Sequence, residues 1–253
     1  MRSEHSHQAR RRTGRVRSLA LCVAAFTLVA GSTVVPASEP DSGDTNGAVL
    51  GRSDQPLTEY RAFRRMYATT EKSTHEAWLE AWTELKDGRF TYDIVSERGS
   101  EMVRGKVLRS MLQREQELVN SGNTAKGDLT DANYDFNEAG RDADGSRVVE
   151  IKPKRKDVLL VDGHAVLDPR GDLLRVEGRL AKNPSFWTSL VNIVRRYARI
   201  AGVRVPIATE TTAKVKMVGT SKLQVTYDYE SVNGKPVVIT AARSEAHAHS
   251  AAR

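Results

Sequence analysis

Apolar and polar residues alternate through most of the chain between residues 57 and 242, a pattern typical of β-strands. Residues 77–85 and 90–94 each place their apolar side chains on one face. Between them, Lys86-Asp87-Gly88 is typical of a tight turn. The two segments therefore predict a hairpin with one apolar face.

The rest of this region repeats the pattern. Asp162-Gly163 predicts a two-residue turn, and Pro206 suggests a bulge or an edge strand. Leu174, Val176 and Leu180 are expected to share a face. Residues 60–66 fit either a helix or a strand. Strands are expected at residues 147–151, 158–161, 164–167, 172–181, 191–200, 203–217, 222–231 and 236–240.

One amphipathic helix interrupts the strands. Ser100 can cap its start and Ser121-Gly122-Asn123 ends it. Its apolar face is formed by Val103, Val107, Met111 and Leu118. Sequential hairpins build an antiparallel sheet, a sheet of this length curls, and its apolar face needs a cover that the helix can supply.

The N-terminus has the three zones of a secretory signal peptide. Six arginines between Arg2 and Arg17 are followed by the uncharged apolar run 18–31 and by the small-residue site Val35-Pro36-Ala37. The run is about 14 residues, short for a membrane span. We therefore expect a signal peptide at 1–37, with an uncleaved N-terminal anchor as the alternative, and an extracytoplasmic location that is periplasmic or secreted.

Charge and cysteine content change once this segment is set aside. The chain has 39 Lys and Arg and 32 Asp and Glu; six of the former and one of the latter lie within 1–37, which leaves 33 and 31. The remainder is nearly neutral, so we expect no nucleic-acid partner. Cys22 is the single cysteine and lies in the signal, which excludes disulfides and thiolate chemistry from the mature chain.

Composition divides the remainder into three parts. Residues 38–56 are rich in Gly, Ser and Asp and predict a flexible leader, and residues 243–253 predict a disordered tail. One domain is expected between them, at 57–242.

Four segments carry a resemblance to known proteins: VLLVDG (158–163), LRVEGRLAKNPSFW (174–187), RYARIAGVRVP (196–206) and TYDYESVNG (226–234). They resemble a family of exported bacterial proteins of uncertain role, whose architecture is similar to that of the LolA-like superfamily of outer-membrane lipoprotein-sorting proteins. The resemblance covers roughly residues 57–240 and implies a mainly β (α+β) fold: a strongly curved antiparallel sheet that forms an unclosed β-barrel, with a helix or helices over its concave face.

Catalytic and metal-binding patterns are weak. His75 and His164 lie near turns outside any metal-spaced cluster, and His247 and His249 fall in the polar tail. The Asp142-Ala-Asp144-Gly145 segment lacks the other ligands of a calcium loop. We therefore expect no enzymatic activity and no cofactor.

Two surface features are candidates for partner contact. Lys152, Lys154, Arg155 and Lys156 form a basic run that can serve as a patch for lipid headgroups or an acidic partner, or simply be a solvated connection. Arg195 and Arg199 lie on the same face of the predicted strand as Tyr197, and they suggest a second, solvent-exposed basic stripe.

The function expected from these features is non-enzymatic binding of a lipid, acyl chain or lipoprotein anchor in an apolar cavity. The alternative is a cell-envelope sensor or scaffold that binds a protein partner through exposed aromatics such as Trp78 and Trp82 and the basic run. Peripheral membrane contact is compatible with both. The cavity candidates, which can equally be plain core, are Leu79, Phe90, Tyr92, Ile94, Val107, Met111, Val176, Phe186, Trp187, Leu223 and Val225.

Overall fold

The computed structural model describes residues 54–71, 75–216 and 219–238, which form one antiparallel sheet of 11 strands and a helical segment. The predicted signal peptide, most of the leader and the tail lie outside the described residues. The strands are β1 (Tyr60–Thr70), β2 (Glu76–Lys86), β3 (Arg89–Gly99), β4 (Tyr134–Arg141), β5 (Arg147–Pro153), β6 (Val161–Leu167), β7 (Leu173–Leu180), β8 (Thr188–Ile200), β9 (Val203–Val215), β10 (Gly219–Val232) and β11 (Lys235–Pro236).

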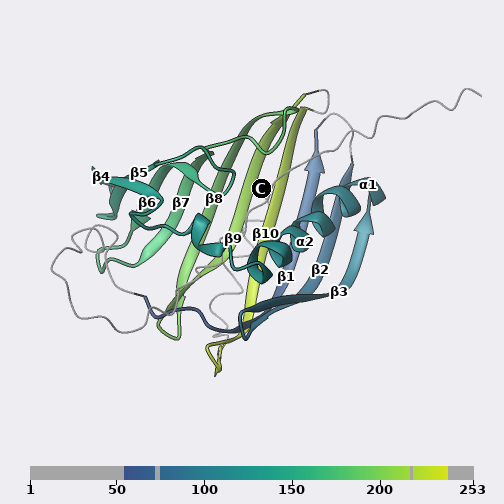
Figure 1. Ribbon diagram of the computed structural model, residues 1–253, viewed down its shortest axis with the longest axis horizontal. Coiled ribbons are helices and arrows are strands. Elements are labelled where there is room, and N and C mark those ends of the chain that lie inside the picture. Colours follow the sequence, from purple (N-terminus) through teal and green to yellow (C-terminus); the bar gives the residue numbers. More distant parts are fainter. Residues whose placement is uncertain (1–53, 72–74, 217–218, 239–253) are drawn as a thin grey trace, which may run out of the picture.

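The sheet is curved and unclosed, which confirms the predicted fold class. Its order is β3-β2-β1-β10-β9-β8-β7-β6-β5-β4, so the first and last long strands, β1 and β10, pair inside the sheet, while β3 and β4 are the two edges. These edge strands are consecutive in sequence. Residues 100–133, which we call the crossing segment, therefore pass from one edge of the sheet to the other (Figure 1).

The crossing segment begins with the predicted helix. It consists of α1 (Glu101–Val103), a π-helical turn η1 (Arg104–Arg109) and α2 (Ser110–Asn120), followed by the 3₁₀ turn η2 (Thr124–Gly127). The helix packs on β1, β2 and β3. The π-helical turn alters the helical phase, so Val119 is buried and Leu118, expected on the apolar face, is only partly covered.

Two hairpin turns form where the sequence places residues that tolerate a positive φ. Asp87 and Gly88 have φ of 51° and 70°, a conformation that glycine and aspartate tolerate, and they close the β2–β3 hairpin as predicted. Asn233 and Gly234 close β10–β11 in the same way.

One predicted hairpin is wrong. Residues 161–167 form the single strand β6, and Asp162-Gly163 lies inside it. Gly163 faces Gly178 on β7, and a Cβ on Gly163 would lie 2.1 Å from the carbonyl oxygen of Glu177. The glycine is there because two strands approach closely, which is the other common reason for glycine in a strand.

Two bulges bear on the sequence predictions. The β6–β7 register shifts between Val166 and Leu167, so Leu174 is exposed rather than sharing the buried face of Val176 and Leu180. On β9 the register shifts beside Pro206, which confirms the bulge suggested by that proline.

The described residues begin at Asp54, within the predicted leader. Asp54, assigned to the leader, forms ion pairs with Arg199 (2.7 Å) and Arg204 (3.0 Å). Within the described residues, no helix is long and apolar enough to cross a membrane.

Candidate functional site

The concave face of the sheet, beneath the crossing segment, is where the core lies. Alternate residues of β10 are buried there: Leu223, Val225, Tyr227 and Tyr229. Of the predicted cavity candidates, Tyr92 and Ile94 pack partly buried against this core. Seven more are buried in it: Leu79, Phe90, Val107, Met111, Val176, Leu223 and Val225.

A buried ion pair joins the sheet to the helix. Arg64 on β1 and Glu115 on α2 are each about 2% exposed, and the guanidinium donates to both carboxylate oxygens at 2.5 and 2.9 Å. It also donates to the Tyr60 hydroxyl at 2.7 Å and lies 4.7 Å from the ring centre of Tyr227. Burial alone would lower the pKa of Arg64, but the Glu115 carboxylate together with Tyr60 and Tyr227 outweighs it, so that this pKa lies well above its usual value.

Three tyrosines surround this pair. Burial raises the pKa values of Tyr60, Tyr227 and Tyr229, and the positive charge of Arg64 only partly offsets it. Tyr60 meets Tyr229 edge-on with ring centres 5.8 Å apart, and Tyr227 stacks on Tyr229. The phenols therefore stay protonated and polar inside an otherwise apolar face.

A second buried cation, Arg195 on β8, corrects the predicted exposed stripe. It is 3% exposed, because strand alternation places it on the same face as the buried Val191 and Ile193. Its Nε lies 3.4 Å from the Thr209 hydroxyl, a long hydrogen bond, and its Nη2 has no hydrogen-bond partner among the described residues. Arg199, by contrast, is satisfied by Asp54 and Asp172.

Further polar atoms without partners lie on the same face. In the described part of the chain, the hydroxyls of Thr211 and Ser221 and the Nε of Arg64 are buried and make no hydrogen bond. Folded proteins leave few such atoms unsatisfied. Their gathering on four adjacent strands, β8, β9, β10 and β1, marks this part of the concave face as a place for a polar group.

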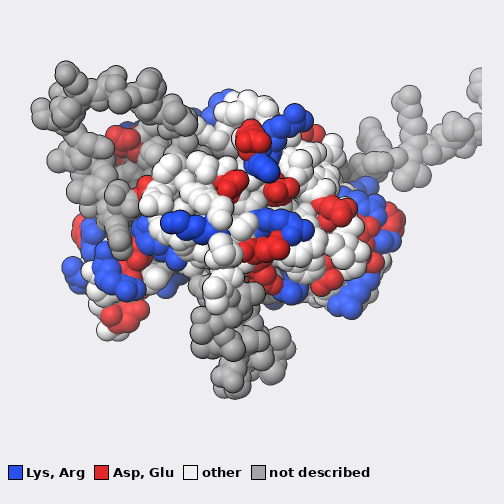
Figure 2. All heavy atoms as spheres, turned by 90° about the horizontal axis from the view of Figure 1, so that it is seen from below, with Lys and Arg blue, Asp and Glu red and all other residues white. Residues whose placement is uncertain are grey.

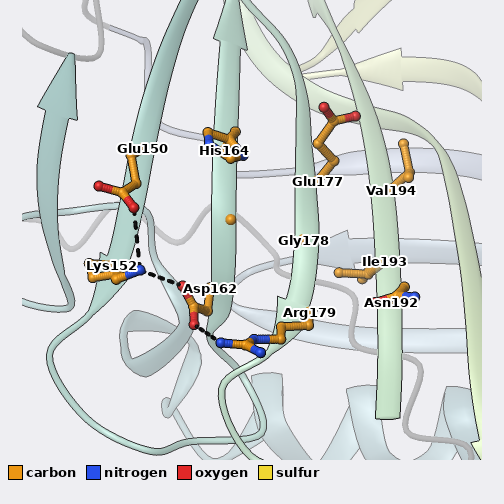
Figure 3. Close-up of a pocket in the computed structure, with 11 residues that line it drawn as sticks. Glu150, Lys152, Asp162, His164, Glu177, Gly178, Arg179, Asn192, Ile193 and Val194 are labelled. Atoms are coloured by element: carbon orange, nitrogen blue, oxygen red, sulfur yellow. Dashed lines mark hydrogen bonds and ion pairs between the residues drawn. The ribbon is translucent and has the colours of Figure 1, made fainter. Parts of the chain in front are cut away.

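The opposite face carries a pocket of about 570 Å³ over β5–β8 (Figure 3). Its floor includes the Gly163–Gly178 contact, and exposed side chains rim it. Lys152 pairs with Glu150 at 3.3 Å and with Asp162 at 3.4 Å, and Arg179 pairs with Asp162 at 3.0 Å. Glu150, Lys152, Asp162 and Arg179 therefore form one ion-paired network at the rim of the pocket.

The predicted basic run does not gather into one cationic patch. Lys152 is engaged in the pocket, and Lys154 pairs with Asp135 at 3.5 Å. Arg155 donates to the Asn133 side chain at 2.6 Å and so holds the end of the crossing segment. Lys156 is exposed. On the face seen in Figure 2, basic and acidic side chains are interspersed.

The two aromatic candidates in the β7–β8 connection lie apart from the other cavity candidates. Phe186 is 78% exposed and Trp187 is 39% exposed. Their rings meet edge-on at 5.6 Å, and the Lys216 ammonium lies 4.2 Å from the centre of the Phe186 ring. They form an exposed aromatic pair at one end of the sheet.

Trp78 and Trp82 lie on the outer face and are half-buried by neighbours on the sheet. Tyr67 packs on Trp78 at 5.0 Å and Phe63 packs on Trp82 at 5.2 Å. Arg61 lies over the Trp82 ring at 4.2 Å. The described residues contain no group of three or more metal-ligating side chains.

Comparisons with known proteins give a fold likeness. No protein-family model and no curated protein matches the chain. Among solved structures, the chain is similar to a LolA superfamily protein from Nitrosomonas europaea, with 11% identity, a TM-score of 0.33, and coverage of 75% of this chain and 90% of that one.

Two other solved structures show the same kind of likeness. One is a DUF1329 family protein from Desulfovibrio piger, with 14% identity, a TM-score of 0.26, and coverage of 78% and 92%. The other is lipovitellin, with 8% identity, a TM-score of 0.28, and coverage of 74% of this chain but 26% of lipovitellin. All three likenesses are at low identity and have TM-scores below 0.5.

The sequence reasoning missed the buried charges. Arg64 lies in a segment whose pattern fitted either helix or strand, and Glu115 interrupts the apolar stripe four residues after Met111. For Arg195, the signal was the alternation of the strand, which places Arg195 on the same face as the apolar Val191 and Ile193 and so predicts its burial.

Proposed function

We propose that this protein is an extracytoplasmic binding protein without catalytic activity, which holds a lipid, an acyl chain or a lipoprotein anchor between the concave face and the crossing segment. The observation that carries the proposal is a curved, unclosed sheet whose apolar concave face lies under one contiguous segment. Each methylene removed from water contributes about 0.8 kcal/mol, so an acyl chain needs little polar recognition to bind such a face.

The contacts of the crossing segment suit a cover that moves. Its polar contacts with the sheet include Arg64–Glu115, the pairs of Glu97 with Arg109 and Arg104, and the hydrogen bonds of Phe90 with Asn120 and Gln116. Of these contacts, the Arg64–Glu115 pair is the one whose two side chains are both about 2% exposed, and pairs that solvent reaches contribute less. The basic and apolar zones at residues 2–31 support export, as does the resemblance of four segments to exported proteins.

Native mass spectrometry of the gently extracted protein tests this proposal, followed by titration with a fluorescent acyl probe. We expect co-purified lipid, or probe binding that the same dye without its chain does not reproduce. Ala213→Leu fills the concave face, whereas Lys214→Leu adds the same side chain to the exposed side of the same strand. Bare protein that binds no probe would refute carriage, as would equal binding by both variants.

A second candidate function is protein binding through the outer face, as expected of an envelope sensor or scaffold. It is favoured by the half-buried aromatics Phe63, Tyr67, Trp78 and Trp82, which lie on the exposed side of β1 and β2. Trp82→Ala should then abolish capture of an envelope protein in crosslinking while leaving acyl binding unchanged. Loss of acyl binding in that variant would contradict a separate outer-face role.

A further inference from the structure

The buried charges of the concave face do not balance. Three charged side chains are buried in the described residues, namely Arg64, Glu115 and Arg195. Both carboxylate oxygens of Glu115 are used by Arg64. Arg195 is left without an anionic partner, although an unpaired charge is among the costliest groups to bury.

The position of Arg195 is central. It lies opposite Val176 on β7 and opposite Thr209 on β9, and Thr209 in turn lies opposite Val225 on β10. Thr211, whose hydroxyl has no partner in the described chain, follows on the same face of β9, about 7 Å further along by the spacing of alternate strand residues. A free guanidinium nitrogen and a free hydroxyl therefore lie within an apolar wall.

We propose that Arg195 is the anchor for an anionic headgroup, a carboxylate or a phosphate, of an acyl-chain ligand bound on the concave face. The inference rests on the proposed function and names the ligand class for that site. A guanidinium matches carboxylate and phosphate oxygens with paired hydrogen bonds, which strengthen when water is excluded. The surrounding Val176, Ile193 and Val225 suit the chain that follows the headgroup.

The test compares ligands of one chain length. Palmitate, hexadecyl phosphate and neutral hexadecanol are titrated into the full chain, with acetate and inorganic phosphate as free anions. We expect both anionic amphiphiles to bind at least about tenfold more tightly than the alcohol, since hydrogen bonds to a charged partner are the strong ones. Acetate and inorganic phosphate should bind far more weakly, because they bury no chain.

Two neighbouring variants locate the effect. Arg195→Gln should remove the preference for the anionic ligands and leave hexadecanol binding unchanged. Arg196→Gln is the matched control, because Arg196 is the next residue on β8, is exposed and pairs with Glu210 on the outer face. It should keep the full preference.

The outcomes separate this inference from the proposed function. If the protein binds hexadecanol and palmitate equally, the headgroup assignment is overturned while apolar binding stands. If it binds none of the three amphiphiles, the proposed function fails first. Free acetate or phosphate binding as tightly as palmitate would also overturn the assignment, because it would indicate a site for small anions.

Stability gives an independent readout. An unpaired buried charge destabilises the ligand-free fold, so Arg195→Met should leave the thermal midpoint unchanged or raise it. Palmitate should raise the midpoint of the unaltered protein and not that of the variant. Failure of Arg195→Gln and Arg195→Met to fold would show that Arg195 is paired within the protein, and would refute the inference.

Discussion

Glu115→Gln tests whether the Arg64–Glu115 pair holds the helix to the sheet. The substitution keeps the size of the side chain and leaves Arg64 buried without its anion. Both partners are about 2% exposed, so the loss falls in the range for a broken buried pair, about 3 to 5 kcal/mol. For a domain of this size that corresponds to a thermal midpoint lower by about 6 to 20 °C.

Urea unfolding followed by tryptophan fluorescence and by far-ultraviolet circular dichroism measures the change. Glu230→Gln is the control, because Glu230 pairs with Arg61 at the surface, where the side chains are 52% and 43% exposed. That variant should lose no more than about 1 kcal/mol. The double variant Arg64→Met/Glu115→Leu should recover most of the loss, because apolar side chains of similar size replace both charges.

Two results would refute this reasoning. One is a loss in Glu115→Gln as small as that in Glu230→Gln, which would mean that water reaches the pair. The other is a double variant less stable than Glu115→Gln, which would mean that Arg64 is stabilised by Tyr60 and the aromatic rings rather than by the carboxylate.

Further predictions concern the helix and the close approach of two strands. The hydrogen bond from Arg109 lowers the pKa of Glu97 in the folded protein. The contribution of ionised Glu97 to the stability of the fold should therefore be complete above the unfolded pKa of about 4.5 and be lost as the pH falls through the lower folded value. Glu97→Gln should flatten this pH dependence in urea unfolding. In a variant with cysteines at positions 97 and 109, a short bis-maleimide cross-link between them should block uptake of an acyl probe. The same variant before cross-linking should bind the probe. Equal uptake by the two forms would show that the helix stays docked during loading. Gly163→Ala should destabilise by about 1 to 3 kcal/mol, since its Cβ would meet the Glu177 carbonyl at 2.1 Å, and Gly105→Ala, with open space around its Cβ, should not; equal thermal midpoints would contradict the close approach.

The sequence predicted the elements whose signals are local. The β2–β3 hairpin was accessible because alternation and the Lys86-Asp87-Gly88 turn agree, and the helix because its apolar spacing has clear ends. The curved, unclosed sheet came from the family resemblance and was confirmed. Strand β6 was missed because Asp162-Gly163 has the composition of a turn, while the real cause of the glycine is a neighbour on another strand.

The candidate site was less predictable, because its chemistry depends on pairings far apart in sequence. Nothing local to Arg64 reveals that Glu115, 51 residues away, will meet it. Arg195 was predicted to be exposed because it lies on the same strand face as Arg199 and Tyr197, whereas Val191 and Ile193 on that same face are buried. The assignments of the cavity candidates and of the basic run to ligand or headgroup contact stay predictions.

The crossing segment has a mechanical consequence. Because it runs from β3 directly into β4, both of its ends are tied to the rims of the sheet. Its middle can move away from the sheet, but the segment cannot detach unless β3 or β4 unpairs from its neighbouring strand. If a ligand binds on the concave face as proposed, it would enter along the sheet from an open end, and the 34 residues of the crossing segment (100–133) limit how far the two edges can move apart.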